Sequence, residues 1–161
     1  MTGPISVLNE VGYPLDEARL REAARAVLAR HEVEADLTIV LTDDAAVADL
    51  NRQYRGVDAP TDVLSFSADT PPVMDTNELP YLGDLIIAYP YAAAQADREG
   101  HDRMHSFILL VVHGTLHLLG YDHDTTAHRT EMWAAQDAAL KILGIPVMIV
   151  PDLESDHHAS Q

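Results

Sequence analysis

HDRMHSFILLVVHGTLHLLGYDH, residues 101–123, contains the strongest helical pattern in this chain. An apolar stripe predicts a helix from His101 to Leu119 with one side turned to the core, and the stripe consists of Phe107, Val112, Leu116 and Leu119. Gly120 follows, and glycine readily adopts the left-handed backbone conformation with which helices commonly end. We therefore expect a long helix that stops at Gly120.

Three histidines in this segment have the spacing of a metal site. His113 and His117 lie four residues apart, so their imidazoles share one face of the helix. After the turn at Gly120, the chain can bring His123 back towards them. Three imidazoles leave one coordination position of Zn²⁺ open, which is typical of catalytic rather than structural zinc sites. We predict that His113, His117 and His123 bind one zinc ion per chain; other divalent transition metals such as Ni²⁺, Co²⁺ or Cu²⁺ suit the same ligands.

The same histidine spacing occurs in metzincin proteases, where a glutamate directly after the first histidine is the general base. In this chain that position is Gly114, which has no side chain to accept a proton. The sequence therefore predicts the ligand geometry without the peptidase base, and this argues against a protease.

The rest of the chain adds amphipathic helices and short strands. Helices are expected over Leu15–His31, from Thr42-Asp43-Asp44 to Gly56, over Pro90–Glu99 and over Thr126–Leu143, and strands over Asp36–Leu41, Asp62–Phe66 and Gly83–Ala88. The proline-rich stretch 69–80 predicts irregular structure. The last helix carries a stripe of Trp133, Gln136, Leu140 and Leu143. This order predicts an α+β fold, a single domain with a small sheet covered by helices and some antiparallel pairing.

Composition bounds the function. The 161 residues suit one domain, and the hydrophobic fraction of 47% suits a globular fold. The absence of cysteine excludes disulfides, thiol nucleophiles and Cys-ligated zinc. A net charge of −16 argues against a broad phosphate-binding surface but allows a focused cationic site. The N-terminal residues lack signal-peptide features and the longest apolar run is six residues, 107–112, so we expect a cytoplasmic protein with no membrane partner.

A second dense segment, YRGVDAPTDVLSF, covers residues 54–66. By itself it consists of a helix end, a turn and a strand, which capping and turn residues explain. Together with HGTLHLLGYDH at 113–123 and LGDLIIA at 82–88, however, it resembles the YbeY family, the metal-dependent endoribonucleases of bacterial rRNA maturation. The resemblance is specific from residue 51 to residue 143, and Met132 falls where the family starts its last helix.

The resemblance implies a small mixed β-sheet packed with helices around a metal cleft. We expect one domain of this kind over residues 1–151, and the polar, acidic composition of residues 152–161 predicts a flexible tail. The three histidines would be the zinc ligands, and Arg55 matches the arginine that meets RNA in the cleft. Ser67 and Ala88 depart from the residues common at their positions in the family, but neither is a proposed ligand.

The implied activity is single-strand-specific hydrolysis of RNA, with roles in maturing the 3′ end of small-subunit (16S) rRNA and in ribosome quality control. The implied partners are single-stranded RNA and rRNA, small-subunit ribosomal proteins and a maturation GTPase. We assign catalysis to His113, as a zinc ligand, and to Arg55. The hypothesis is that zinc activates the nucleophile or polarises the scissile phosphate while Arg55 stabilises the phosphoryl charge. The nucleophile is either water or the RNA 2′-hydroxyl.

Two other functions fit the same residues. A zinc-dependent hydrolase of another phosphoester would suit the acidic composition, and a non-catalytic ribosome-assembly factor would use zinc only to tie the last two helices together. Among the remaining polar residues, Asp122 could support the third histidine, and Asp62 and Ser65 could orient the arginine or face the cleft. We expect Trp133 to lie in the core rather than to stack on a nucleobase.

Overall fold

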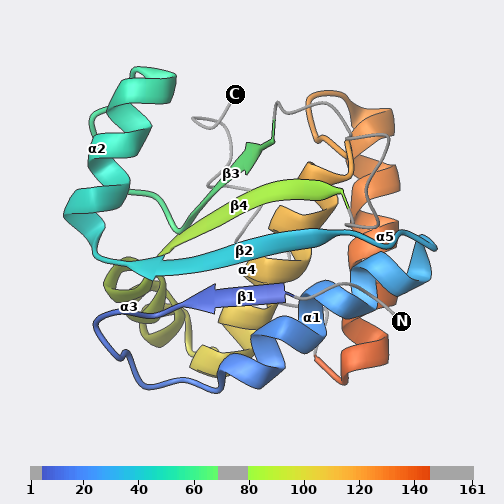
Figure 1. Ribbon diagram of the computed structural model, residues 1–161, viewed down its shortest axis with the longest axis horizontal. Coiled ribbons are helices and arrows are strands. Elements are labelled where there is room, and N and C mark those ends of the chain that lie inside the picture. Colours follow the sequence, from blue (N-terminus) through green and yellow to red (C-terminus); the bar gives the residue numbers. More distant parts are fainter. Residues whose placement is uncertain (1–4, 69–79, 146–161) are drawn as a thin grey trace.

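Four strands and five helices make up the fold in the part of the chain that the structure, a computed structural model, describes, namely residues 5–68 and 80–145. In chain order they are β1 (Ile5–Leu8), α1 (Glu17–Arg30), β2 (Asp36–Thr42), α2 (Asp44–Arg55), β3 (Val63–Ser67), β4 (Tyr81–Ala88), α3 (Tyr89–Glu99), α4 (Arg103–Leu118) and α5 (Thr126–Leu143) (Figure 1). The strands form one sheet in the order β1-β2-β4-β3. Strands β1 and β4 run parallel to β2, whereas β3 runs antiparallel to β4. The molecule is thus a small α+β domain with a mixed sheet, which confirms the predicted fold class.

The edge strand β1 is missing from the predicted elements. It pairs in parallel with β2, from Ile5 opposite Leu37 to Leu8 opposite Val40. Of its four residues only Ile5 is buried, and Leu8 is 50% exposed. Because the apolar–polar alternation covers only the three residues Ile5-Ser6-Val7, the sequence does not distinguish this strand from a loop.

Two helices begin slightly later than their hydrophobic periodicity predicts, because an aspartate caps the first turn of each. Asp102 accepts a hydrogen bond from the backbone N–H of His105, so α4 begins at Arg103 and not at the predicted His101. Asp16 caps α1 in the same way, and α1 begins two residues after its predicted start. Both caps satisfy backbone donors that the first turn of a helix leaves unpaired.

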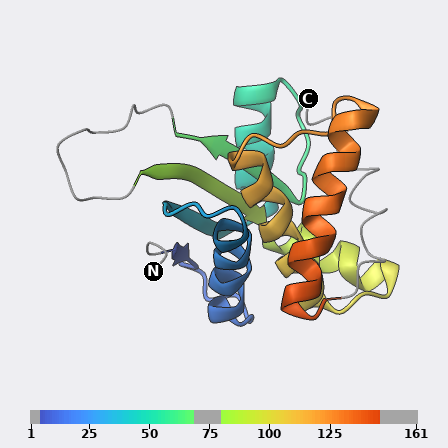
Figure 2. The same cartoon turned by 90° about the vertical axis from the view of Figure 1, so that its right-hand side faces the viewer.

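The two faces of the sheet have separate cores. On β4, Leu85 and Ile87 belong to the core under α1 and α4, whereas Ile86 and Ala88 belong to a smaller cluster with Val47 of α2. Figure 2 shows α4 between the sheet and α5. Every residue of α4 from 107 to 116 is buried, whereas the sequence pattern predicted one buried stripe. The helix that carries the histidine motif is therefore the central element of the fold.

Some predictions concern residues outside the described ranges. The predicted irregular stretch falls there except for residue 80, and so do the expected domain end at 151 and the tail 152–161. The helices within residues 5–68 and 80–145 include no candidate for a membrane-spanning segment.

Candidate metal centre

The C-terminal half of α4 presents His113 and His117 side by side. Their ring centroids are 4.7 Å apart, and their Nε2 atoms approach to 3.1 Å. His113 is fully buried and His117 is partly exposed. The pair therefore has its nitrogens directed to one point at the end of a buried helix.

The turn after α4 brings in the third histidine. Gly120 has a φ of 104°, and the backbone N–H of Tyr121 donates to the carbonyl of Leu116 at 3.0 Å, which closes the helix end. The ring of His123 then lies with its centroid 5.7 Å from that of His113 and 5.2 Å from that of His117. One nitrogen from each of the three rings lies within 4.8 Å of the others, so the three predicted residues do come together.

Two hydrogen bonds fix the orientation of the α4 histidines. Nδ1 of His113 lies 2.9 Å from Oε1 of Gln136 on α5, and Nδ1 of His117 lies 3.0 Å from the carbonyl oxygen of Tyr121. Both oxygens can only accept a hydrogen bond, so each Nδ1 carries the proton. Each Nε2 consequently offers a lone pair towards the other ring, and two lone pairs that face each other at 3.1 Å suit a shared cation.

The donor set fits a metal ion. Metal–nitrogen bonds of about 2.0–2.1 Å in a tetrahedral site place two imidazole nitrogens roughly 3.3 Å apart, close to the observed 3.1 Å. Burial lowers the pKa of His117, and the repulsion it would meet from a protonated His123 lowers it further. Burial also lowers the pKa of His123. Neutral imidazole is the form that ligates metal, so the site could bind a metal ion at neutral pH.

Gly114 faces the sheet and not the histidines. A Cβ atom there would lie 2.7 Å from Cδ2 of Leu85 and 3.3 Å from Oγ of Ser65. Gly114 has no side chain, and a side chain there would point at Leu85 and the sheet, so no base stands where a metzincin has one. Ser65, which the sequence left as a candidate for orienting Arg55, lies at this helix–sheet contact.

Arg55 is the last residue of α2, and Gly56 ends the helix with a φ of 73°. The following loop is held by Asn51, whose Nδ2 donates to the carbonyl of Ala59 at 2.9 Å. The Arg55 guanidinium is half-buried, and this burial lowers its pKa. The positive charge of Arg55 also contributes to the lowered pKa of His117, so the guanidinium and the histidine cluster interact electrostatically. Its Nη1 atom is buried with no hydrogen-bond partner among the described residues.

The weaker candidates have structural roles or border the site. Asp122 accepts a hydrogen bond from the backbone N–H of His123 at 2.7 Å, so it supports the turn. Asp62 is buried and accepts from the backbone N–H of Val63 at 2.8 Å, at the start of β3. Trp133 packs against the core but is only partly buried, and its ring lies 5.8 Å from that of His113 and 5.9 Å from that of His123. Its predicted place in the core is therefore half right, because the indole also flanks the histidines.

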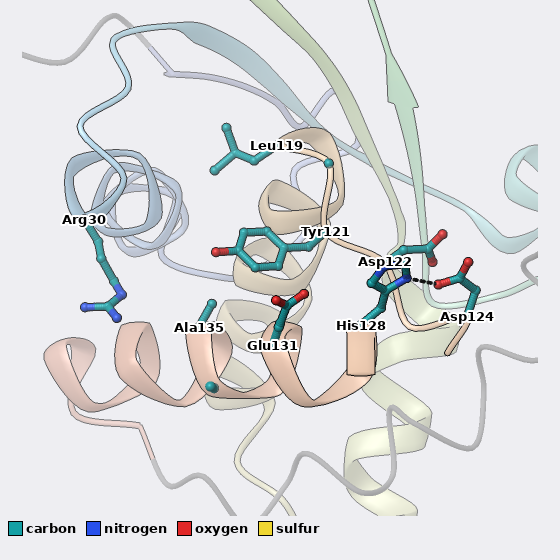
Figure 3. A pocket seen from close by; sticks show the side chains of 10 residues that line it. Arg30, Leu119, Tyr121, Asp122, Asp124, His128, Glu131 and Ala135 are labelled. Carbon is teal, nitrogen blue, oxygen red and sulfur yellow. Dashed lines mark hydrogen bonds and ion pairs between the residues drawn. The ribbon is translucent and has the colours of Figure 1, made fainter. Parts of the chain in front are cut away.

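A cavity of about 820 Å³ lies beside this turn, between α1 and α5 (Figure 3). It is lined by Arg30, Leu119, Gly120, Tyr121, Asp122, Asp124, His128, Glu131, Ala134 and Ala135, and neither Arg55 nor any of the three histidines of the cluster lines it. The hydroxyl of Tyr121 lies 2.9 Å from Nε2 of His31 at the end of α1. Tyr121 therefore belongs both to the cavity wall and to the turn between α4 and His123, and its backbone carbonyl orients His117.

Gln136 and the Tyr121 carbonyl are functional groups that the sequence motifs did not single out. The available signal for Gln136 was a polar residue in the apolar stripe of the last helix. The carbonyl left no signal, because every residue has one.

Comparisons with known proteins give a matching family and a solved structure of similar fold. The model of the family described as "Endoribonuclease YbeY" matches residues 8–144. A protein of that name from Moorella thermoacetica is 44% identical over 147 residues, which is 85% of this chain and 94% of the relative. One from Chloroflexus aggregans is 42% identical over 152 residues, 91% of this chain and 99% of the relative. A solution structure of a Thermotoga maritima protein has a similar fold, with a TM-score of 0.58 and 22% identity over 98% of this chain and 96% of that chain.

Proposed function

The chain belongs to the YbeY family of endoribonucleases, and we propose that it is a metal-dependent hydrolase that cleaves single-stranded RNA. In this proposal His113, His117 and His123 hold one zinc ion and Arg55 binds the substrate phosphate. The biological substrate is the 3′ region of small-subunit (16S) rRNA, and the enzyme also serves ribosome quality control.

The observation that carries the proposal is a half-buried guanidinium whose positive charge acts on His117 of the converging imidazole cluster. The three ligand nitrogens lie within 4.8 Å of one another, and Nη1 of Arg55 is buried with no hydrogen-bond partner in the described part of the chain. A charged donor left in this state is stabilised by an anion, and a phosphate oxygen suits a guanidinium geometrically. A metal cation held by the histidines and the guanidinium of Arg55 would together bind the anionic oxygens of a phosphodiester.

The protein's own residues have distinct tasks in this site. The three histidines supply neutral nitrogen ligands, and Gln136 and the Tyr121 carbonyl hold two of the rings in the required tautomer. Arg55 binds the phosphate and stabilises the charge that develops on its oxygens during cleavage. A bound divalent ion supplies Lewis acidity and lowers the pKa of water.

The acidic composition favours a second candidate, a hydrolase of small phosphoesters. A net charge of −16 repels a long polyanion everywhere except at a focused site, and a small substrate avoids this repulsion. The same charge suits docking on basic ribosomal proteins or a maturation GTPase in the cytoplasm, which we include in the proposal as partners. The relative rates on RNA and on small phosphodiesters distinguish the two candidates.

The proposal is tested by cleavage of single-stranded RNA, double-stranded RNA and a small phosphodiester by metal-loaded protein. We expect preference for single-stranded RNA, and a fall of about 10²- to 10³-fold in kcat/KM for Arg55→Ala with its metal content retained.

Arg52→Ala is the matched control. Arg52 lies on the same helix, is exposed and pairs with Asp49, so its loss should leave the rate unchanged. Wild-type cleavage by Arg55→Ala contradicts the role of Arg55. Faster turnover of the small phosphodiester than of RNA supports the second candidate.

A further inference from the structure

Gln136 is a fully buried polar residue on α5, a helix outside the histidine motif. Its Oε1 atom lies 2.9 Å from Nδ1 of His113, which is also fully buried. We infer that Gln136 is a positioning residue of the metal centre, which holds His113 in the tautomer whose Nε2 binds the ion. This inference rests on the proposed function in that it takes the three histidines as the ligands.

The chemistry of the amide determines the tautomer. A carbonyl oxygen has no proton to donate, so Nδ1 of His113 must carry the hydrogen of this bond. The Nε2 atom, on the opposite side of the ring, then has a free lone pair for a metal. The reversed amide would donate to Nδ1, move the ring proton to Nε2 and remove that lone pair. Only the observed orientation leaves His113 able to ligate.

The amide nitrogen of Gln136 indicates that a polar side chain at this position lowers the stability of the fold. Nε2 of Gln136 is buried and has no hydrogen-bond partner in the described ranges. A buried amide donor without an acceptor is unfavourable, and an apolar side chain of the same size would avoid it. The neighbours of Gln136 in the stripe of α5, such as Leu140, are apolar. The polar residue in this stripe is explained by its bond to His113 and not by packing.

The two α4 histidines are therefore held in different ways. His117 is oriented by the backbone carbonyl of Tyr121, which no substitution removes directly. His113 is oriented by a side chain 23 positions away, so the docking of α5 on α4 completes the metal site. Hydrogen bonds of this kind to a ligand histidine typically contribute a factor of about 10–100 in metal affinity.

The test uses three variants of the full chain. Gln136→Met keeps the size of the side chain and removes the acceptor, whereas Gln136→Glu keeps an oxygen acceptor. Thr115→Val is the matched control, because Thr115 is buried and lies between His113 and His117 in the sequence, and its hydroxyl donates to the carbonyl of Val111 at 2.7 Å rather than to a ligand histidine. Zinc affinity is measured by competition with a chromogenic chelator, the tautomer of His113 by ¹⁵N NMR of the metal-free protein, and stability by thermal unfolding of the metal-free protein.

We expect Gln136→Met to weaken zinc binding about 10- to 100-fold, to move the His113 proton partly to Nε2, and to unfold at the same or a higher temperature than wild type. Gln136→Glu and Thr115→Val should retain wild-type affinity. Wild-type affinity and an unchanged tautomer in Gln136→Met would overturn the inference, as would an equal loss of affinity in Thr115→Val. If the wild type takes up no zinc, the proposed function fails, and the tautomer of His113 alone decides the inference.

Discussion

Arg55 holds a positive charge in a half-buried position at the end of α2. Burial disfavours a charged group, which is why the pKa of Arg55 is lowered, and buried charges in proteins are normally paired. Arg55 nevertheless has an Nη1 atom with no hydrogen-bond partner among the described residues. An unfavourable local arrangement of this kind is common at binding sites, where the ligand supplies the missing partner.

Asp124 and His128 form an exposed ion pair that shifts the pKa values of both side chains. Nδ1 of His128 lies 2.6 Å from Oδ1 of Asp124, and this bond raises the pKa of His128 and lowers the pKa of Asp124. The contribution of His128 to stability is present below its unfolded pKa and is lost as the pH rises through the raised folded value. The contribution of Asp124 is present above its unfolded pKa and is lost as the pH falls through the lowered folded value. The pair therefore stabilises the fold in mildly acidic solution, between these two limits.

We expect an NMR titration of His128 to give a pKa above the ordinary histidine value, and Asp124→Asn to bring it back. Asp122→Asn is the control, because Asp122 bonds to the backbone of His123 and contributes less to the pKa of His128. A His128 pKa that does not respond to Asp124→Asn would show that the ion pair is absent in solution.

The site was partly predictable because its first elements are local. Residues four apart on a helix are neighbours whatever the rest of the fold does, so the proximity of His113 and His117 follows from the sequence. The return of His123 follows from a glycine that ends the helix. The bond from His113 to Gln136 joins two helices through tertiary packing, and no local pattern contains it.

At the scale of elements, the fit of β3 against β4 depends on Gly83. This glycine has a φ of 145°, and a Cβ atom would overlap the backbone carbonyl oxygen of Phe66 on β3. A register shift between β2 and β4 lies beside it, between Asp36 and Leu37. The backbone here leaves no space for any side chain.

We expect Gly83→Ala to lower the free energy of unfolding by about 3–4 kcal/mol, because both the φ angle and a backbone clash oppose the added methyl group. Gly100→Ala separates the two causes. Its φ is 74° but nothing lies within 4 Å of the added atom, so we expect a loss of only about 1–2 kcal/mol. Urea unfolding of both variants checks this, and equal losses would contradict the proposed clash.

Elements with strong periodicity or caps were predictable, and those decided by packing were not. The sequence places eight of the nine elements, but β1 has a single buried residue and is held by pairing with β2. It also predicts a one-sided α4, whereas α4 is enclosed by the sheet, α1 and α5. Enclosure is a property of the assembled layers, and an apolar helix looks the same in sequence whether one face or all of it is covered.

For the whole molecule, the proposed site is positively charged whereas the chain as a whole is strongly acidic. The net charge is −16, yet the proposed RNA contact combines an arginine with a metal. Most RNA-binding proteins gain affinity by releasing many counterions from phosphates, which makes their binding steeply dependent on salt. A focused site on an acidic protein touches few phosphates.

We therefore expect metal-loaded protein to bind a single-stranded oligonucleotide with a shallow salt dependence. One or two phosphate contacts give a slope of about −0.7 to −1.4 in a plot of log K against log salt concentration. Fluorescence anisotropy between about 50 and 200 mM salt measures it. A slope steeper than about −4 would require an extended basic surface and would contradict a focused site.

If His113, His117 and His123 form a metal centre, the purified protein should contain metal that depends on them. The measurement is made on protein purified without a histidine tag or added metal, beside His117→Ala and the control His128→Ala, whose histidine is exposed and outside the cluster. We predict about one equivalent of zinc in the wild type and in His128→Ala, and none in His117→Ala. A wild type that contains no metal and takes none up on addition would show that the three histidines are not a metal centre, as would full metal content in His117→Ala.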